Sequence, residues 1–186
     1  SMLAPWLIGH PRNRQMNEPL IRLARPGDYQ RILDILNDAI EKRRYTALLT
    51  PVTIESRRQW FQDHQDGRHP IYVADIGDDI AGWMAVTAYR DGREGFCHAC
   101  EVSYYVDPAC MGRGVATALM NYVIDVSTEA GLKHLMAVIF ADNIASQALA
   151  RKFGFEQWGR FPDIVEIDGQ TKDCLQMGLA LTQKSE

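Results

Sequence analysis

Apolar and polar positions recur along this chain with two different periods, which predicts a domain of mixed strands and helices. Residues 20–25 alternate between apolar and polar and predict a strand. Apolar residues then recur at helical spacing over 26–40, where a proline and an aspartate suit the first turn of a helix. Thr53 suits the N-cap of a second helix, which runs through the aromatic pair Trp60 and Phe61.

The middle and last thirds of the chain contain more strands than helices. Residues 134–140 form a continuous apolar run, which predicts a strand that is buried on both faces. The order of elements lacks the strict strand–helix alternation of a doubly wound fold and predicts an α+β (mixed α/β) domain. The other expected elements are two strands within 71–92 that turn at 77–79, an extended segment over 96–106, a helix over 115–131, a short helix over 143–154, and two final strands around a turn at 168–169.

Composition narrows the class of protein. The chain has 186 residues, of which 46% are apolar, and this is enough for a single domain with a continuous core. We expect residues 1–19 to form a tail without an organised signal peptide, and residues 20–182 to form the domain. The formal net charge is −4, with no long run of one sign. We therefore expect no nucleic-acid partner and no membrane partner.

The four cysteines favour a reducing environment. A domain of this size and apolar content needs no disulfide framework, so we expect a cytoplasmic protein. Cys97 and Cys100 could be taken for half of a zinc site, but no second pair lies near them in the sequence. On a strand, cysteines at that spacing also point to opposite faces. We therefore predict free buried thiols and no metal.

The stretch DPACMGRGVATALM, residues 107–120, carries a candidate anion site. Gly112 and Gly114 lack the Cβ atoms that would cover the backbone at the start of the following helix, and Ala116 keeps the next position small. A helix N-terminus with uncovered amides attracts anions, and Arg113 could add a cation at its rim. The same pattern also fits a plain tight turn. It is neither a P-loop nor a Rossmann fingerprint, because no G-K-[ST] follows and the third glycine of G-x-G-x-x-G is absent.

Two neighbouring segments change the interpretation of this turn. It is preceded by GFCHACEVSYYV and followed by NIASQALARKFGF, which starts at Asn143. In this order the three segments resemble the GCN5-related N-acetyltransferases, whose acetyl-CoA turn reads Q/R-x-x-G-x-G/A and whose later segment reads N-x-x-[AS]-x-x-L…G-F. Met111 is the departure within the turn. The positions that match outside the turn are Gly95, Phe96, His98, Glu101, Ser103, Tyr105, Val106, Asn143, Ser146, Leu149, Gly154 and Phe155.

The preceding segment is closest to G-F-x-H-x-x-E-x-S-x-Y-V of the phosphinothricin and methionine-sulfone (L-amino acid) N-acetyltransferases. The resemblance covers residues 20–181. It implies the GNAT fold, which is a central, mixed, mostly antiparallel sheet of about seven strands flanked by about four helices.

The resemblance also implies that acetyl-CoA is the co-substrate. Amides of the glycine turn would hold its pyrophosphate, and its pantetheine arm would pair with a strand edge, where the amide near Tyr104 would face the thioester oxygen. Asn143 would hydrogen-bond the arm or the sulfur region. The residues expected to bind acetyl-CoA are Tyr104, Tyr105, Val106, Met111, Gly112, Arg113, Gly114, Val115, Ala116, Thr117, Asn143 and Ser146.

Glu101 is the candidate general base, which would remove a proton from the acceptor amine directly or through a water. It lies among apolar and aromatic neighbours, where desolvation raises the pKa of a carboxylate. Taken alone, the same residue could be a structural glutamate satisfied by an arginine or a hydroxyl group. His98, which strand alternation places on the opposite face, is the second candidate for the base.

The leaving thiolate has no evident proton donor. Many members of the resembled family carry a tyrosine or a histidine after the leucine of the late helix, and here that residue is Ala150. A thiolate with a pKa of about 8.5 can leave without assistance. Tyr105 remains an alternative donor.

The acceptor pocket departs from the resembled subfamily. Tyr89 and Arg90 stand in place of a W-R pair whose arginine holds the substrate carboxylate, so Arg90 is the candidate clamp. A solvated arginine at the end of a strand is the alternative. Tyr45 and Trp83 are further candidates, although each could equally be a surface or a core residue. The last hairpin keeps only Asp173 of the subfamily pattern.

These features predict an acetyl-CoA-dependent N-acetyltransferase that acts by direct transfer on the primary amine of a small amino-acid-like acceptor. We also expect a homodimer, since dimers are common in the resembled family. Two alternatives stay open. One is an acyl-CoA sensor without turnover, which Ala150 and the altered hairpin would fit, and the other is an acetyltransferase of protein N-termini or lysines.

Overall fold

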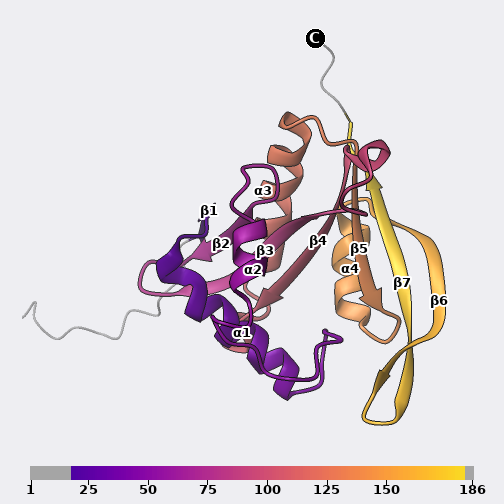
Figure 1. Cartoon of the computed structure of the whole chain (residues 1–186), viewed down its shortest axis with the longest axis horizontal. Coiled ribbons are helices and arrows are strands. Elements are labelled where there is room, and N and C mark those ends of the chain that lie inside the picture. Colours follow the sequence, from indigo (N-terminus) through magenta and orange to yellow (C-terminus); the bar gives the residue numbers. More distant parts are fainter. Residues whose placement is uncertain (1–17, 183–186) are drawn as a thin grey trace, which may run out of the picture.

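Seven strands form one sheet in the computed structural model, which describes residues 18–182 (Figure 1). The expected tail, 1–19, lies almost entirely outside the described residues. The strands lie in the order β1-β2-β3-β4-β5-β7-β6; β4 and β5 run parallel, and every other neighbouring pair is antiparallel. This confirms the predicted mixed, mostly antiparallel sheet. The strands are β1 (Leu20–Leu23), β2 (Ile71–Asp75), β3 (Ile80–Ala88), β4 (Ala99–Val106), β5 (His134–Phe140), β6 (Glu156–Ile167) and β7 (Gln170–Ala180).

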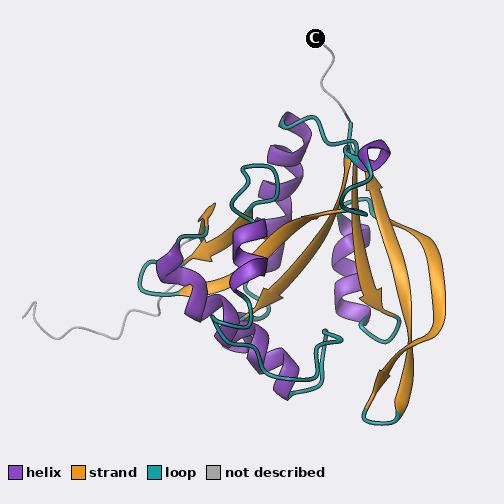
Figure 2. Ribbon diagram, viewed as in Figure 1, coloured by secondary structure: helices purple, strands orange, loops and turns teal. Residues whose placement is uncertain are grey.

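Helices cover both faces of the sheet (Figure 2). The α1 and α2 helices pack on one face, and α3 and α4 pack on the other. The predicted order of strands and helices is confirmed, with short 3-10 turns added between them. None of the helices in the described part of the chain is long and apolar enough to cross a membrane. The helices are α1 (Tyr29–Glu41), α2 (Arg58–Asp63), α3 (Val115–Glu129) and α4 (Ile144–Lys152).

Two main apolar cores result from this layering, one on each face of the sheet. A small third cluster joins Phe140, Ile167 and Cys174. The apolar stripe of α1, which includes Ile32 and Leu36, packs on the β2 and β3 side chains of one face. The stripe of α3 packs on the other face, starting at Val115. Gly82 of β3 permits this close approach, because a Cβ atom there would lie 3.1 Å from Cγ1 of Val115. The N-terminus of α3 is therefore held against the middle of the sheet.

The sheet branches between β4 and β5. Their parallel pairing covers only the start of both strands and ends at the pair Glu101 and Met136. Beyond that pair the two strands diverge, and β5 pairs along its whole length with β7 instead (Figure 1). The remainder of β4 therefore faces a gap in the sheet, which we call the β4–β5 gap.

The β4–β5 gap corrects one sequence prediction. Residues 134–140 were expected to be buried on both faces, but Val138 is 45% exposed and His134 is exposed. Both side chains belong to the face opposite α3 and α4, where no helix covers β5. A continuous apolar run thus lies partly in the open because a neighbouring strand has turned away.

Two local predictions are also wrong. The extended segment expected over 96–106 begins only at Ala99, because residues 94–96 form a 3-10 turn and His98 lies in the turn that follows. Thr53 does not cap the second helix: its hydroxyl accepts a hydrogen bond from the amide of Ser56, and α2 starts at Arg58. In both places a short turn, which has no apolar period of its own, precedes the regular element.

Candidate active site

The glycine turn lies at the start of α3 and leaves its backbone uncovered. Gly112 and Gly114 have φ angles of 74° and 78°, in the left-handed region that favours glycine. A Cβ atom at either position would have no atom within 4 Å. Met111 is 53% exposed, so its side chain does not close the turn over either. These open amides at a helix N-terminus can hold an anion of the size of a diphosphate.

A charged cluster holds this turn to the rest of the fold. Asp107 precedes the turn, and its carboxylate accepts a hydrogen bond from the amide of Ala109. Arg31 of α1 pairs with that carboxylate and, at 2.9 Å from its Nε, with Asp79 in the turn between β2 and β3. These contacts, with burial opposing them, hold the pKa of Asp107 below its usual value. The glycine turn is therefore held to α1 and, through Arg31, to the turn between β2 and β3.

The edge of β4 offers backbone amides to the β4–β5 gap. The amide of Asp107 donates to Ala81 of β3, and the carbonyl of Ala99 accepts from Tyr89, so odd-numbered residues of β4 direct their backbone groups to β3. Backbone direction alternates along a strand. The amides of Tyr104 and Val106 therefore point into the gap, next to the glycine turn. The predicted pairing edge over 104–106 thus includes two amides that face the gap.

Across the gap, β4 and α4 are joined by one side-chain hydrogen bond. The hydroxyl groups of Tyr104 and Ser146 lie 2.8 Å apart. Burial raises the pKa of the Tyr104 phenol, so that group stays protonated. Asn143 caps α4, because its side-chain oxygen accepts from the amide of Ser146. Ala150, one turn further along α4 than Ser146, is buried and has no polar group to offer.

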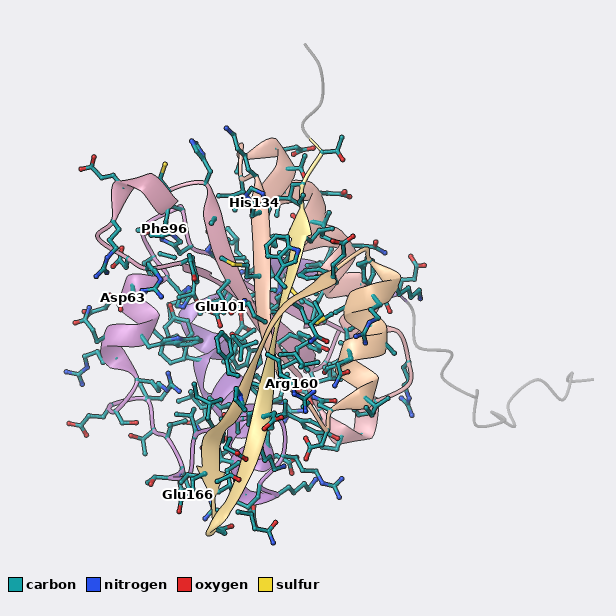
Figure 3. The ribbon with its side chains drawn as sticks, turned by 90° about the vertical axis from the view of Figure 1, so that its right-hand side faces the viewer. Asp63, Phe96, Glu101, His134, Arg160 and Glu166 are labelled. Atoms are coloured by element: carbon teal, nitrogen blue, oxygen red, sulfur yellow. The ribbon has the colours of Figure 1, made fainter. Side chains whose placement is uncertain are left out.

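Glu101 lies at the point where the sheet branches. Its side chain is labelled in Figure 3. Strand alternation places Glu101, Ser103 and Tyr105 on the face opposite Tyr104. Burial raises the pKa of its carboxyl group, and burial is the only cause of that shift. No side chain in the described part of the chain forms an ion pair with it. The alternative of a structural glutamate satisfied by an arginine is therefore not what the structure of residues 18–182 contains.

The expected acceptor residues fall into two groups. The hydroxyl of Tyr105 donates to the carbonyl of Tyr45 at 3.4 Å, so the loop after α1 meets the same face as Glu101. Trp83 stacks on Tyr105 but is only 2% exposed, and its indole N–H donates to the carbonyl of Ile32, which gives it a core position behind Tyr105.

Arg90 and His98 lie elsewhere. Arg90 is exposed in the turn after β3, and its guanidinium stacks on the ring of Tyr89 at 5.7 Å. His98 is exposed in the turn before β4, where its backbone carbonyl accepts hydrogen bonds from Lys133 and His134. The structure brings neither side chain into contact with Tyr105, and His98 is not part of the strand that was expected to orient it.

Sequence reasoning did not identify Arg57 or Trp60, which join the Tyr105 side of the site. The Arg57 guanidinium lies 5.3 Å from the centre of the Trp60 ring, and the Trp60 and Trp83 rings are 5.7 Å apart. The sequence does show two arginines, Arg57 and Arg58, just before Trp60. It does not indicate which of the two arginines lies next to the Trp60 ring. Their different burial depends on how α2 packs, with Arg57 half-buried and Arg58 exposed.

The cysteines show no sign of activation. Burial raises the pKa of the Cys100 thiol to about 11 and raises the pKa values of the Cys110 and Cys174 thiols. Cys97 is exposed, which corrects the prediction that it is buried, because it precedes β4 instead of lying within it. Residues 18–182 contain no cluster of three or more histidine, cysteine or acidic side chains that could hold a metal.

Comparison with known proteins agrees with this geometry. The sequence profile of the Acetyltransferase (GNAT) family matches residues 30–155. YwnH of Bacillus subtilis (strain 168), whose name assigns it provisionally as a phosphinothricin acetyltransferase, is 38% identical over 163 residues, 87% of this chain and 99% of the relative. The L-methionine sulfoximine/L-methionine sulfone acetyltransferase of Pseudomonas aeruginosa is 34% identical over 164 residues, 87% of this chain and 94% of the relative.

A solved structure extends the likeness to the fold. The phosphinothricin acetyltransferase of Sinorhizobium meliloti, a GNAT superfamily protein solved in complex with acetyl-CoA, superposes with a TM-score of 0.83 at 25% identity. The match covers 89% of this chain and 89% of that chain. The described elements therefore have the arrangement of a known acetyltransferase.

Proposed function

Because the chain belongs to the GNAT acetyltransferase family, we propose that it transfers the acetyl group of acetyl-CoA directly to the primary amine of a small amino-acid-like acceptor. As a member of this family it is an N-acetyltransferase. The acceptor class is supported by the relatives named for methionine sulfone and phosphinothricin.

The observation that carries the proposal is the desolvated carboxylate of Glu101 at the branch of the sheet. An amine in water at neutral pH is mostly protonated and has no lone pair for attack. A carboxylate whose pKa is raised by burial is a stronger base than an exposed one. Glu101 removes a proton from the ammonium group, directly or through one water, and the free amine then attacks the thioester carbonyl to form the C–N bond. The C–S bond breaks as the tetrahedral intermediate collapses, and CoA leaves as the thiolate.

The residues of the β4–β5 gap fit acetyl-CoA. The uncovered amides at Gly112 and Gly114, in the first turn of α3 with Val115, Ala116 and Thr117, suit its diphosphate. Acetyl-CoA supplies the thioester carbonyl that the amine attacks. The gap-facing amide of Tyr104 donates a hydrogen bond to the oxygen that becomes negatively charged. The hydroxyl groups of Tyr104 and Ser146 pair between β4 and α4, and Asn143 caps α4 next to Ser146, which supports assigning these residues to the pantetheine arm.

Direct transfer is favoured over an acyl-enzyme by the state of the thiols. The buried cysteines have raised pKa values and are poor nucleophiles at neutral pH. Cys97 is exposed but lies in a turn outside β4. We expect Cys97→Ala to leave the rate of transfer unchanged.

A thiol-release assay tests the function. Purified protein is mixed with acetyl-CoA and a panel of L-amino acids, methionine sulfone, phosphinothricin, polyamines and peptides. We expect release of CoA thiol only with small amino acids or their analogues. Tight acetyl-CoA binding without release for any amine would instead support an acyl-CoA sensor, and release with peptides alone would support an acetyltransferase of proteins.

We also propose a homodimer in the cytoplasm. The edge strand β6 carries exposed apolar side chains, with Trp158 46%, Phe161 40% and Ile164 61% exposed. An exposed apolar sheet edge of this kind is a favourable surface for pairing with a second copy of the chain. Light scattering of the full chain should give twice the mass of 21.1 kDa, and a monomer mass would contradict the dimer.

A further inference from the structure

Arg57 is a half-buried cation without an acidic partner. It lies immediately before α2. Burial lowers the pKa of its guanidinium, and in the described part of the chain the only opposing influence is the Tyr105 hydroxyl. Other arginines with restricted exposure are paired: Arg22 with Asp28 and Asp75, and Arg31 with Asp79 and Asp107. Arg57 therefore differs from these arginines, because it forms no ion pair with a carboxylate among the described residues.

The Arg57 guanidinium lies over one ring of an aromatic cluster. We call Trp60, Trp83 and Tyr105 the aromatic corner, because the Trp83 ring contacts both of the others. The ring centres are 5.7 Å apart for Trp60 and Trp83 and 5.1 Å apart for Trp83 and Tyr105. Arg57 lies over the Trp60 ring at 5.3 Å. Burial raises the pKa of the Tyr105 phenol, and a hydrogen bond with the Thr46 side chain and the charge of Arg57 oppose that rise. Rings hold a guanidinium in place but do not neutralise it.

The aromatic corner and Glu101 share one face of β4. Glu101, Ser103 and Tyr105 alternate with residues of the opposite face, so their side chains project toward the α1 and α2 side. The Cα atoms of Glu101 and Tyr105 are separated by about 13 Å of strand, a span that two long side chains and a small molecule can bridge. A molecule with its amine at Glu101 therefore extends naturally toward Arg57.

The charges suggest what that molecule carries. Burying a guanidinium without a counterion costs free energy, because the charge loses hydrogen bonds to water. A carboxylate that accepts two hydrogen bonds from the guanidinium replaces those lost interactions. An acceptor with an amine at one end and a carboxylate at the other matches the acid–base polarity of the site.

We propose that Arg57, supported by the aromatic corner, binds the carboxylate of the acceptor and makes the enzyme selective for amino acids over amines of the same shape without a carboxylate. This assignment rests on the proposed transferase function. It places the carboxylate contact on α2, whereas the sequence indicated Arg90, which the structure places in an exposed turn.

The test compares two acceptors that differ only in the carboxylate. For the best amino acid of the panel, with L-methionine sulfone as the first choice, kcat/KM is measured for the free acid and for its carboxamide. We expect wild-type protein to favour the acid roughly 10- to 100-fold, in line with one charge-assisted, bidentate contact. Arg57→Ala should remove that preference by slowing the acid and not the amide. Arg57→Lys should show a preference for the acid between those of wild type and Arg57→Ala, because lysine keeps the charge but cannot donate two parallel hydrogen bonds to a carboxylate.

Matched variants separate this role from others. Arg58→Ala removes the exposed neighbouring arginine of α2 and should leave both acceptors unchanged. The affinity for acetyl-CoA, from calorimetry, should be the same in all variants. Equal losses for acid and amide in Arg57→Ala would overturn the assignment while leaving the transferase function standing, as would an acid-selective loss in Arg90→Ala alone. Absence of transfer by the wild type to either acceptor would contradict the proposed function, and the assignment with it.

Discussion

Two charged side chains of the candidate site differ from most half-buried charged groups of residues 18–182, because neither forms an ion pair there. Several arginines and aspartates in the described part of the chain form ion pairs, as in Arg160 with Asp173. Glu101 and Arg57 are half-buried on one face and lack such partners in the described part of the chain. Sequence reasoning identified Glu101 from its place in a motif. It could not identify Arg57, because its burial comes from the packing of α2 and not from its neighbours in sequence.

Burial of Glu101 has a consequence for stability that can be measured. The folded protein raises the pKa of this carboxyl group, so folding favours the protonated form. Its contribution to stability is fully present below its ordinary pKa and is lost as the pH rises through the raised value. Glu101→Gln, which mimics the protonated form, should therefore be as stable as wild type at pH 4 and more stable at pH 7.

Urea unfolding at the two pH values checks this prediction. Glu166→Gln, on the exposed part of β6, is the control and should show no such difference. A Glu101→Gln protein that is less stable than wild type at pH 7 would mean that the carboxylate has a stabilising partner.

The glycine turn gives a second prediction at this scale. Gly114→Val places a branched side chain at a φ of 78°, which costs about 1–2 kcal/mol, and covers the amides at the start of α3. We expect the Kd for acetyl-CoA to rise at least about 10-fold, the loss of one or two phosphate hydrogen bonds. Gly131→Val carries the same strain at the other end of α3, with φ of 84° and open space around it. Calorimetry should find that Gly131→Val binds acetyl-CoA as tightly as wild type. An equal loss of affinity in both variants would mean that backbone strain, and not the covered amides, weakens binding.

At the scale of elements, the apolar periods predicted nearly every helix and strand, because each element buries a face that its own sequence specifies. The branch between β4 and β5 could not be predicted in this way. It depends on which strand β5 pairs with after Met136, and that choice involves residues 170–180, far along the chain. Val138 is consequently exposed although its segment is entirely apolar.

The hydrogen bond across the β4–β5 gap can be tested by a double-mutant cycle. Tyr104→Phe and Ser146→Ala each remove one partner of the 2.8 Å contact and should each lower the free energy of unfolding by about 1 kcal/mol. The double variant should lose little more than either single one, since the two hydroxyl groups act as a pair. Additive losses measured by urea unfolding would show that the groups do not interact across the gap.

The hairpin of β6 and β7 carries a close contact that gives another prediction. The Trp158 ring lies against Gly178, where a Cβ atom would be 2.0 Å from Cε3 of the ring. Gly178→Ala should destabilise the fold by about 1–3 kcal/mol, because the ring must move away. In a Trp158→Ala background the same change should cost little, and Gly159→Ala, which has 3.9 Å of room, serves as the control. Equal costs of Gly178→Ala in both backgrounds would argue against this contact.

The whole molecule consists of two halves of one sheet that pair at the start of β4 and β5. The candidate site uses both halves together with α2, α3 and α4, so no single segment of sequence contains it. The motifs predicted a shared site for the glycine turn, Glu101 and Asn143, and that shared site stays a prediction. In the structure the glycine turn begins α3, Asn143 caps α4, and Glu101 lies at the last pair of β4 with β5. The acceptor side had weaker motifs, and there the sequence indicated Arg90 while the packing of α2 points to Arg57.

The most direct measurement of the central claim is kcat for thiol release, at saturating acetyl-CoA and acceptor, in wild type and Glu101→Gln. We predict a fall of roughly 10²–10³-fold, typical of removing a general base, with an unchanged Kd for acetyl-CoA. Glu94→Gln, an exposed glutamate before β4, should retain wild-type kcat. A Glu101→Gln enzyme that keeps wild-type kcat would contradict the account, because the desolvated carboxylate at the branch of the sheet would then have no part in the chemistry.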